Sequence, residues 1–342
     1  MKIGLLNGGG DCAGLNAVTR AIVRRAEAYD WEVLGIRHGW EGLIKPDMFK
    51  LTYKEMEPIL SIGGTILKTS RTNPFKRVNG VEDIMENVKG LSLDAIIAVG
   101  GDDTLGVAAK LYKKGLRIVG VPKTMDNDLS NTDFTFGFDS AVNEAMHALD
   151  NLSTTGESHD RVMVVEVMGR HAGWVAAYAG IAAGAHLVLV PEEPFDLDDV
   201  ISLVKKRREK GENATLIVVA EGAILKNVSK FLSAEGKIDE FGHVRLGGIG
   251  HLLANEIEKR TGFETRATVL GHIIRGGQPT AFDRVLSTRF GLAAVDLIKE
   301  NQFGMMVALK GTKIVAVSLE ESTSKMRALD PEVYMAAKAF FD

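Results

Sequence analysis

The chain has 342 residues, of which 45% are hydrophobic and 25% charged, with a formal net charge of −4 and a single cysteine, Cys12. The weak negative charge argues against nucleic acid or an anionic membrane as a partner, so an anionic substrate would need a local cluster of arginines and lysines. One cysteine excludes an internal disulfide bond and favours a reducing compartment. Because no apolar run approaches the roughly 20 residues that span a bilayer and no signal-peptide core is present, we expect a cytoplasmic protein without nucleic-acid or membrane partners.

Short apolar runs rich in β-branched residues alternate with amphipathic stretches along most of the chain, which predicts strands alternating with helices. Strands are predicted at Lys2–Leu6, Glu32–Ile36, Ala95–Val99, Ile118–Val121, Val162–Val167, Leu187–Val190, Thr215–Ala220 and Ala267–Leu270. Helices are predicted at Leu15–Tyr29, Leu105–Lys113, Phe138–Leu152, Trp174–Ala183, Leu197–Glu209, Gly250–Arg260 and Ala281–Lys299. A hairpin is predicted from Met306–Leu309 and Lys313–Val317, which a short turn joins.

This alternation predicts an α/β fold with mostly parallel sheets and right-handed crossovers. So many strands would strain a single sheet, and we therefore expect two Rossmann-like lobes, with the active site in the cleft between them at the carboxyl ends of the strands. The segment Lys226–Gly248 breaks the pattern because it is polar and punctuated by glycine. It is expected to form a surface excursion or small hairpin, or else a linker.

The turn after the first predicted strand, Asn7–Gly14, is rich in glycine. It has neither the Gly-x-Gly-x-x-Gly spacing of dinucleotide-binding turns nor the lysine of a phosphate-binding Gly-x-x-x-x-Gly-Lys loop. A glycine loop at a helix N-terminus suits a phosphate group. A tight turn that needs a positive φ explains the same residues equally well.

Two strings, Gly100-Gly-Asp-Asp-Thr104 and Pro122-Lys-Thr-Met-Asp-Asn-Asp128, follow neighbouring predicted strands and carry the most information. Helix capping explains one aspartate after Gly101, but explains two less well, and an acidic loop can be a plain turn. Glycine backbone forms anion-binding concavities, and carboxylates beside an anion need a divalent cation or act as a base. Together the two strings predict metal-assisted phosphoryl transfer.

Basic residues occur in three further places: Arg71, the Met168-Gly-Arg-His171 string, and the run that holds Arg266, His272 and Arg275. A lone arginine usually forms a surface salt bridge, and a lone histidine is usually structural. Because arginine binds phosphate in a bidentate manner, several basic residues beside a glycine pair favour a clamp for a phosphate ester. No histidine and cysteine cluster has the spacing of a zinc site.

With these strings the chain resembles the phosphofructokinase family nearly from end to end, since all of them occur in the family's order and approximate spacing. The resemblance implies a donor lobe formed by residues 1–137 and about 274–324, which binds pyrophosphate and Mg²⁺. Residues 138–273 and 325–342 would form a fructose 6-phosphate lobe. It also implies a homodimer or homotetramer with active sites shared between subunits.

The resemblance further implies a role for each matching residue. Asp126 would be the base that deprotonates the sugar 1-hydroxyl, and Asp102 and Asp128 would bind Mg²⁺. The donor would be bound by Gly9, Arg71, Asp103 and Lys123, and the transferring phosphoryl group by Thr124, Arg170 and Lys123. Fructose 6-phosphate would be bound by Thr124, Asp126, Met168, Gly169, Arg170, Glu221, His272 and Arg275, with Arg161 and Arg266 supplied by a neighbouring subunit.

Asp103 and Lys123 distinguish the two branches of the family that this chain resembles. The ATP-dependent branch has glycine at both positions, whereas the pyrophosphate-dependent branch has Asp and Lys. An aspartate at 103 would fill space beside the inner phosphate of the donor and repel a nucleotide α-phosphate, and Lys123 would offer charge to a compact donor. At positions that resemble the bacterial effector site, Ser153 and His186 stand where an arginine and a glutamate would be expected, which argues against control by a nucleotide or phosphoenolpyruvate.

The leading hypothesis is therefore reversible phosphoryl transfer from pyrophosphate to fructose 6-phosphate, and the alternative is an ATP-dependent 6-phosphofructokinase. A lipid or NAD kinase also contains Gly-Gly-Asp-x-Thr, but the Met-Gly-Arg and Gly-His-x-x-Arg strings argue against it. A catalytically inactive sugar-phosphate sensor would have lost the base, whereas Asp126 is present.

Overall fold

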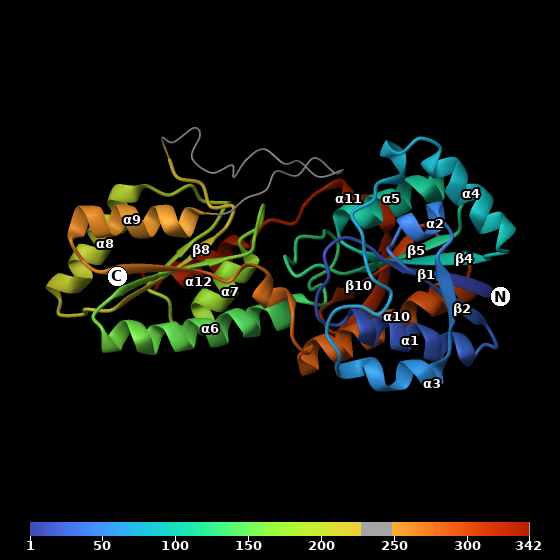
Figure 1. Cartoon of the computed structure of the whole chain (residues 1–342), viewed down its shortest axis with the longest axis horizontal. Helices are drawn as coiled ribbons and strands as arrows, with labels where there is room; N and C mark the ends of the chain where they lie inside the picture. The colour runs from blue at the N-terminus through green and yellow to red at the C-terminus, as the bar shows by residue number, and fades with distance from the viewer. Residues whose placement is uncertain (227–247, 342) are drawn as a thin grey trace. The chain divides into compact units, whose positions relative to one another are not determined.

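The computed structural model describes residues 1–226 and 248–341, which form two compact units. The first unit contains residues 1–140 and 275–326, and the second contains residues 141–226, 248–274 and 327–341. Figure 1 labels the main elements of both units. The predicted segment Lys226–Gly248 lies almost wholly outside the described residues.

A seven-stranded sheet in the order β11-β10-β5-β4-β1-β2-β3 forms the centre of the first unit. Its strands are β1 (Lys2–Asn7), β2 (Glu32–Ile36), β3 (Met48–Leu51), β4 (Ala95–Gly100), β5 (Ile118–Pro122), β10 (Met305–Lys310) and β11 (Lys313–Ser318). All neighbours pair in parallel except β2 with β3 and β10 with β11, so only the two edge strands run antiparallel. The parallel centre requires crossover connections that bring helices onto the faces of the sheet.

Helices cover both faces of this sheet, with α1 and α10 packed together on one face and α5 against α11 on the other (Figure 1). The helices are α1 (Leu15–Glu27), α2 (Glu41–Ile44), α3 (Tyr53–Met56), α4 (Gly80–Gly90), α5 (Asp102–Lys113), α10 (Ala281–Lys299) and α11 (Leu319–Ser324). Two 3₁₀ turns, η1 (Glu57–Ser61) and η2 (Pro74–Lys76), complete the unit. Buried leucine, isoleucine and valine side chains fill the space between sheet and helices.

The second unit contains a parallel four-stranded sheet in the order β7-β8-β6-β9. Its strands are β6 (Val162–Val167), β7 (Leu187–Leu189), β8 (Thr215–Ala220) and β9 (Thr265–Val269). Its helices are α6 (Phe138–Ser158), α7 (Trp174–Ala182), α8 (Leu197–Glu209), α9 (Ile249–Thr261) and α12 (Pro331–Lys338), with the 3₁₀ turn η3 (Gly271–Arg275) after β9. α8 and α9 pack together, and α7 packs against β7, β8 and α12.

The α/β class and the mostly parallel sheets are confirmed, and each strand predicted from the sequence is present within a few residues. Two boundaries differ at places that matter for the site. α5 begins at Asp102 rather than Leu105, because the two aspartates form its first turn. β9 begins at Thr265 rather than Ala267, because pairing with β6 extends it. β3, α4 and the shorter helices were not predicted, since their periodic signal is short.

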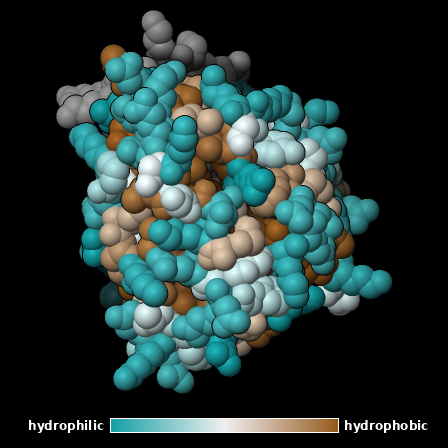
Figure 2. Space-filling model, turned by 90° about the vertical axis from the view of Figure 1, so that its right-hand side faces the viewer, coloured by the Kyte–Doolittle hydropathy of each residue, from teal (hydrophilic) through white to brown (hydrophobic). Residues whose placement is uncertain are grey.

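No helix among the described residues is long and apolar enough to cross a membrane. On the face that Figure 2 shows, hydrophilic side chains cover most of the surface and interrupt the hydrophobic ones.

Candidate active site

Three loops meet at the carboxyl edge of the first sheet, because β1, β4 and β5 are adjacent parallel strands. Backbone hydrogen bonds tie these loops together: the Gly8 N–H donates to the Val99 carbonyl over 2.9 Å, and the Lys123 N–H donates to the Gly100 carbonyl over 3.0 Å. The prediction that the two aspartate-containing strings follow neighbouring strands is confirmed. Ligands of open α/β sheets bind at this edge.

Gly8 and Gly100 enclose the side chain of Thr104, which is buried in the first turn of α5. A Cβ atom at Gly8 would lie 2.5 Å from Thr104 Oγ1, and one at Gly100 would lie 2.3 Å from Thr104 Cβ. Both positions therefore need glycine for close approach rather than for an unusual φ. Thr104 ends the Gly100–Thr104 string, and the sequence gives it no role of its own. Asp103, one residue earlier, is half-buried.

Lys123 is buried at the start of the loop after β5, and its ammonium group reaches back to the glycine loop. Its Nζ donates to the Gly10 carbonyl oxygen over 2.5 Å, and a Cβ atom at Gly9 would lie 3.6 Å from the same nitrogen. Burial lowers the pKa of Lys123, the positive charge of Arg275 lowers it further, and nearby Asp11 and Asp126 oppose the shift. The structure thus places a buried amine directly behind the predicted donor loop.

Arg275 also contacts the glycine loop, from the opposite end of the chain. Its Nη1 donates to the Asp11 carbonyl over 3.1 Å, and a Cβ atom at Gly10 would lie 2.7 Å from that nitrogen. The resemblance assigned Arg275 to the sugar phosphate beside His272. In the structure, its guanidinium lies within the first unit, against the loop predicted to bind the donor. The alternation of apolar and polar residues in predicted strands gives no indication that Arg275 contacts the Asp11 carbonyl.

Arg71 lies on a segment that runs beside the glycine loop, and its side chain is exposed. The Gly9 N–H donates to the Ser70 carbonyl over 3.1 Å, and Thr69 Oγ1 donates to the Gly9 carbonyl over 2.6 Å. The backbone next to Arg71 is therefore attached to Gly9. The structure brings these two predicted donor-binding residues together.

The turn that carries Asp126 and Asp128 is held in place by Asn127. Asn127 is fully buried, its φ of 51° lies in the left-handed region, and its Oδ1 accepts a hydrogen bond from the Thr135 N–H over 3.0 Å. Asparagine tolerates this conformation better than most residues. The Asp126 N–H donates to Thr124 Oγ1 over 3.1 Å. The three predicted residues Thr124, Asp126 and Asp128 thus lie on one rigid turn.

Asp102, Asp126 and Asp128 concentrate negative charge at this turn. Burial raises the pKa of Asp128 well above its ordinary value, and the charges of Asp126 and then Asp102 raise it further. Clustered carboxylates of this kind are stabilised by a cation. Among the described residues no group of three or more His, Cys, Asp or Glu side chains is arranged to enclose a metal ion. The carboxylates of Asp102 and Asp128 suit a hard divalent cation, because such an ion can bind one or two carboxylates and complete its coordination with substrate phosphates and water.

The second sheet has its own cluster of predicted residues at the carboxyl ends of β6, β8 and β9. Met168, Gly169 and Arg170 follow β6, and the Glu221 N–H at the end of β8 donates to the Val167 carbonyl over 2.8 Å. Gly169 has a φ of 143°, which favours glycine. These four residues are adjacent, and His272 is exposed on η3 after the neighbouring strand β9.

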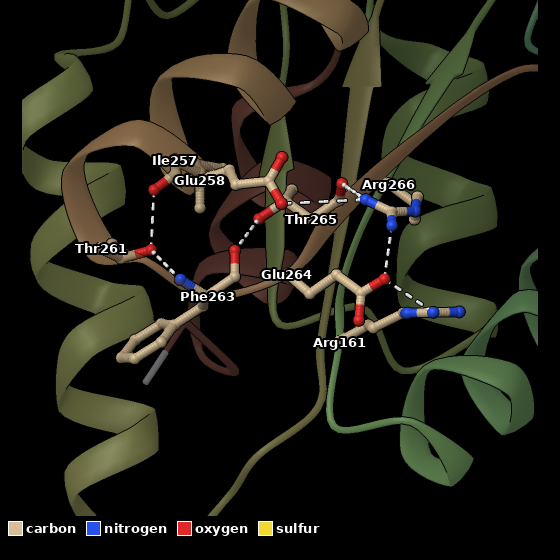
Figure 3. Close-up of polar contacts among 8 residues, drawn as sticks. All are labelled: Arg161, Ile257, Glu258, Thr261, Phe263, Glu264, Thr265 and Arg266. Carbon is tan, nitrogen blue, oxygen red and sulfur yellow. Dashed lines mark hydrogen bonds and ion pairs between the residues drawn. The ribbon is translucent and has the colours of Figure 1, made fainter.

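Arg161 and Arg266 lie at the other end of the same sheet. Arg161 immediately precedes β6, and Arg266 is the second residue of β9, where it pairs with Met163. β6 runs from Val162 to Val167, so Arg161 and Met168 are seven residues apart and separated by about 23 Å, at roughly 3.3 Å per residue. Both arginines bind the carboxylate of Glu264 (Figure 3). The structure brings the two arginines together, and within the second sheet it places them at the opposite end from Met168 and Glu221.

Comparison with known proteins identifies the family of the chain. Residues 2–298 match the family described as Phosphofructokinase. A pyrophosphate–fructose 6-phosphate 1-phosphotransferase from Amycolatopsis methanolica is 56% identical over 342 residues, which covers all of both chains. An ATP-dependent 6-phosphofructokinase from Corynebacterium efficiens is 48% identical, over 100% of this chain and 99% of the relative. The structure of Pichia pastoris phosphofructokinase in the T-state matches with a TM-score of 0.84 and 32% identity, over 99% of this chain and 36% of the longer Pichia chain.

Proposed function

The chain belongs to the phosphofructokinase family, and we propose that it reversibly transfers a phosphoryl group from pyrophosphate to the 1-hydroxyl of fructose 6-phosphate. The products are fructose 1,6-bisphosphate and phosphate. The similarity to the Amycolatopsis phosphotransferase over the whole chain supports this reaction. Since a relative named as ATP-dependent is also similar over nearly all of its length, overall similarity does not decide the donor. The proposal that pyrophosphate is the donor rests on Asp103 and Lys123.

Lys123 favours a compact and highly charged donor. Its buried ammonium group lies behind Gly9 and Gly10, where the backbone would receive the donor phosphates. Charge held in a place with little water interacts with phosphate more strongly than charge on the surface does. Asp103, on the first turn of α5, adds bulk and negative charge at the same edge of the sheet. The additional phosphate of a nucleotide would meet the bulk and the negative charge of Asp103, whereas pyrophosphate would end before it reaches this side chain.

In the proposed mechanism Asp126 accepts the proton of the sugar 1-hydroxyl as that oxygen attacks the terminal phosphorus of pyrophosphate. The bridging P–O bond breaks, and phosphate leaves with the electron pair of that bond. The rigid turn around Asn127 supports this role, because it holds the carboxylate in one place beside Thr124. Thr124, Lys123 and Arg170 would stabilise the charge on the transferring phosphoryl group by donating hydrogen bonds to its oxygens.

A divalent cation, which we propose to be Mg²⁺, would be held by Asp102 and Asp128 and would neutralise charge on the donor when bound. The raised pKa of Asp128 supports this assignment, because a cation would relieve the repulsion among the three carboxylates. A magnesium titration of the Asp102→Ala variant should show a higher magnesium requirement. An unchanged requirement would remove Asp102 from the metal site.

For the sugar, Met168, Gly169, Arg170, Glu221 and His272 would bind fructose 6-phosphate within one chain. Measured along β6 from Met168, Arg161 lies about 23 Å away and Arg266, which pairs with Met163, about 17 Å away, and both would bind the sugar phosphate of another copy. This placement supports a homodimer or homotetramer with shared sites. Arg275 would bind the sugar phosphate together with His272, and its Nη1 also donates to the Asp11 carbonyl of the glycine loop.

A donor panel tests the proposal. Purified protein is assayed for fructose 1,6-bisphosphate formation with pyrophosphate, ATP, ADP or polyphosphate, and for the reverse reaction with fructose 1,6-bisphosphate and phosphate. We expect activity with pyrophosphate to exceed activity with ATP by orders of magnitude, together with a measurable reverse reaction. Equal or greater turnover with ATP would make this chain an ATP-dependent enzyme. In the Asp103→Gly variant, use of ATP should rise and use of pyrophosphate should fall.

A further inference from the structure

We propose that Glu264 is a positioning residue that holds Arg161 and Arg266 as a preformed pair for the phosphate group of the sugar substrate. The inference rests on the proposed function, in which these arginines serve a site of another copy. Glu264 lies on the turn between α9 and β9 and was not identified by sequence analysis. Figure 3 shows its carboxylate between the two guanidinium groups.

One oxygen of Glu264 binds both arginines. Arg161 Nη2 lies 2.6 Å from Glu264 Oε1, and Arg266 Nη2 donates to the same oxygen. The hydrogen bond from Arg161 and the charge of both arginines lower the pKa of Glu264, so the carboxylate is charged at neutral pH. Two guanidinium groups that share one oxygen lie close together, where they would repel each other without the anion.

The backbone around Glu264 is fixed on both sides, as Figure 3 shows. The Phe263 N–H donates to Thr261 Oγ1 over 3.1 Å, and Thr265 Oγ1 donates to the Phe263 carbonyl over 2.9 Å. The Val162 N–H donates to the Glu264 carbonyl over 3.0 Å, which places Glu264 next to Arg161. A rigid backbone that carries a carboxylate can thus orient long arginine side chains, which otherwise lose considerable rotamer freedom on binding.

The arginine pair retains unused donors. Arg161 Nε is buried and has no hydrogen-bond partner among the described residues, although most buried polar atoms are paired. Arg266 Nη1 donates to the Thr265 carbonyl over 3.0 Å, which fixes the plane of its guanidinium group while the side chain stays half-exposed. Both arginine side chains remain partly exposed. Glu264 therefore orients the pair without covering it, and a phosphate dianion can accept hydrogen bonds from the exposed parts of the two guanidinium groups.

The test compares Glu264→Gln, Glu264→Ala and the control Glu258→Gln, each assayed for both substrates. Glu258 is a matched control because it is similarly exposed and its carboxylate forms an ion pair, among the described residues, only with Arg266, at 3.8 Å. We expect the Glu264 variants to raise the KM for fructose 6-phosphate roughly tenfold, as loss of coupling within such a network does. The turnover number, the KM for pyrophosphate and the control variant should change little.

A double-mutant cycle with Arg266→Ala separates positioning from a general structural effect. Once Arg266 is absent, removing Glu264 should raise the KM by clearly less than it does in the parent protein. Additive effects, a KM that stays within twofold, or a lower KM would overturn the positioning role, and the last result would mean that Glu264 competes with the substrate. If Arg266→Ala and Arg161→Ala themselves leave the KM unchanged while the parent protein is active, the shared site is wrong instead.

Discussion

Subunit complementation is the sharpest consequence of the proposed shared site. The Asp126→Ala variant lacks the proposed base, and the Arg266→Ala variant lacks an arginine that the structure places at the far end of the second sheet from Met168. At fructose 6-phosphate concentrations well below the raised KM of the Arg266→Ala variant, each protein alone should be nearly inactive. When their subunits exchange, an intact Asp126 from one chain and an intact Arg266 from the other can complete one site.

The expected recovery of activity equals the fraction of sites that contain both an intact Asp126 and an intact Arg266. In an equimolar mixture that exchanges at random, half of the chains have Asp126 and half of their neighbours have Arg266. About one quarter of the sites should then carry both residues, whether the assembly is a dimer or a tetramer, provided that each site uses one pairwise interface. Activity should therefore rise to about 25% of that of an equal amount of wild-type protein.

The assay measures fructose 1,6-bisphosphate formation before and after mixing under conditions that exchange subunits. Exchange itself is confirmed with differently tagged chains. A mixture of the Asp126→Ala variant with Asp126→Asn is the matched control, because it can assemble no complete site. If exchange is confirmed but activity never exceeds the sum of the two parents, Arg266 acts within its own chain or not at all.

Three further predictions concern single residues. Lys123→Met should lower kcat/KM for pyrophosphate by about 10- to 100-fold, which is the value of a charged hydrogen bond. Urea unfolding of this variant should show little loss of stability, because methionine retains the buried volume of Lys123 without its charge. Unchanged kinetics would contradict the donor role of Lys123. Asp126→Ala should lower turnover by roughly 10²–10⁴-fold and leave calorimetric binding of fructose 6-phosphate intact, and near wild-type turnover would exclude Asp126 as the base. Asp283 is buried, its Oδ2 accepts hydrogen bonds from the N–H and Oγ of Ser140, and burial raises its pKa to about 6. Since the folded state binds this proton more tightly than the unfolded state, stability from this group is present below pH 4 and is lost as the pH rises through 6. The free energy of unfolding of Asp283→Asn should therefore gain about 1.4 kcal/mol relative to wild type between pH 5 and pH 8, and an equal difference at both pH values would refute the assignment.

The sequence by itself determined the α/β class, the position of each strand predicted from it and the place of the two aspartate-containing strings. Apolar periodicity and turn residues depend on a few neighbouring residues, so they can be recognised in the sequence without the tertiary structure. Since parallel strands align their carboxyl ends, the strings after Val99 and Val121 had to lie close together, and they do. The predicted start of α5, Leu105, is later than the observed start, Asp102, because aspartates at the start of a helix resemble a loop in sequence.

Only the tertiary structure decided which distant residues meet. Lys123 is buried against Gly10 because β5 and β1 flank β4, and Arg275 reaches the same loop from a point 264 residues further along the chain than Asp11. The pairing of Glu264 with Arg161 follows from the register of β6 and β9. Strand order and register arise from the packing of the whole unit, and no local pattern encodes them.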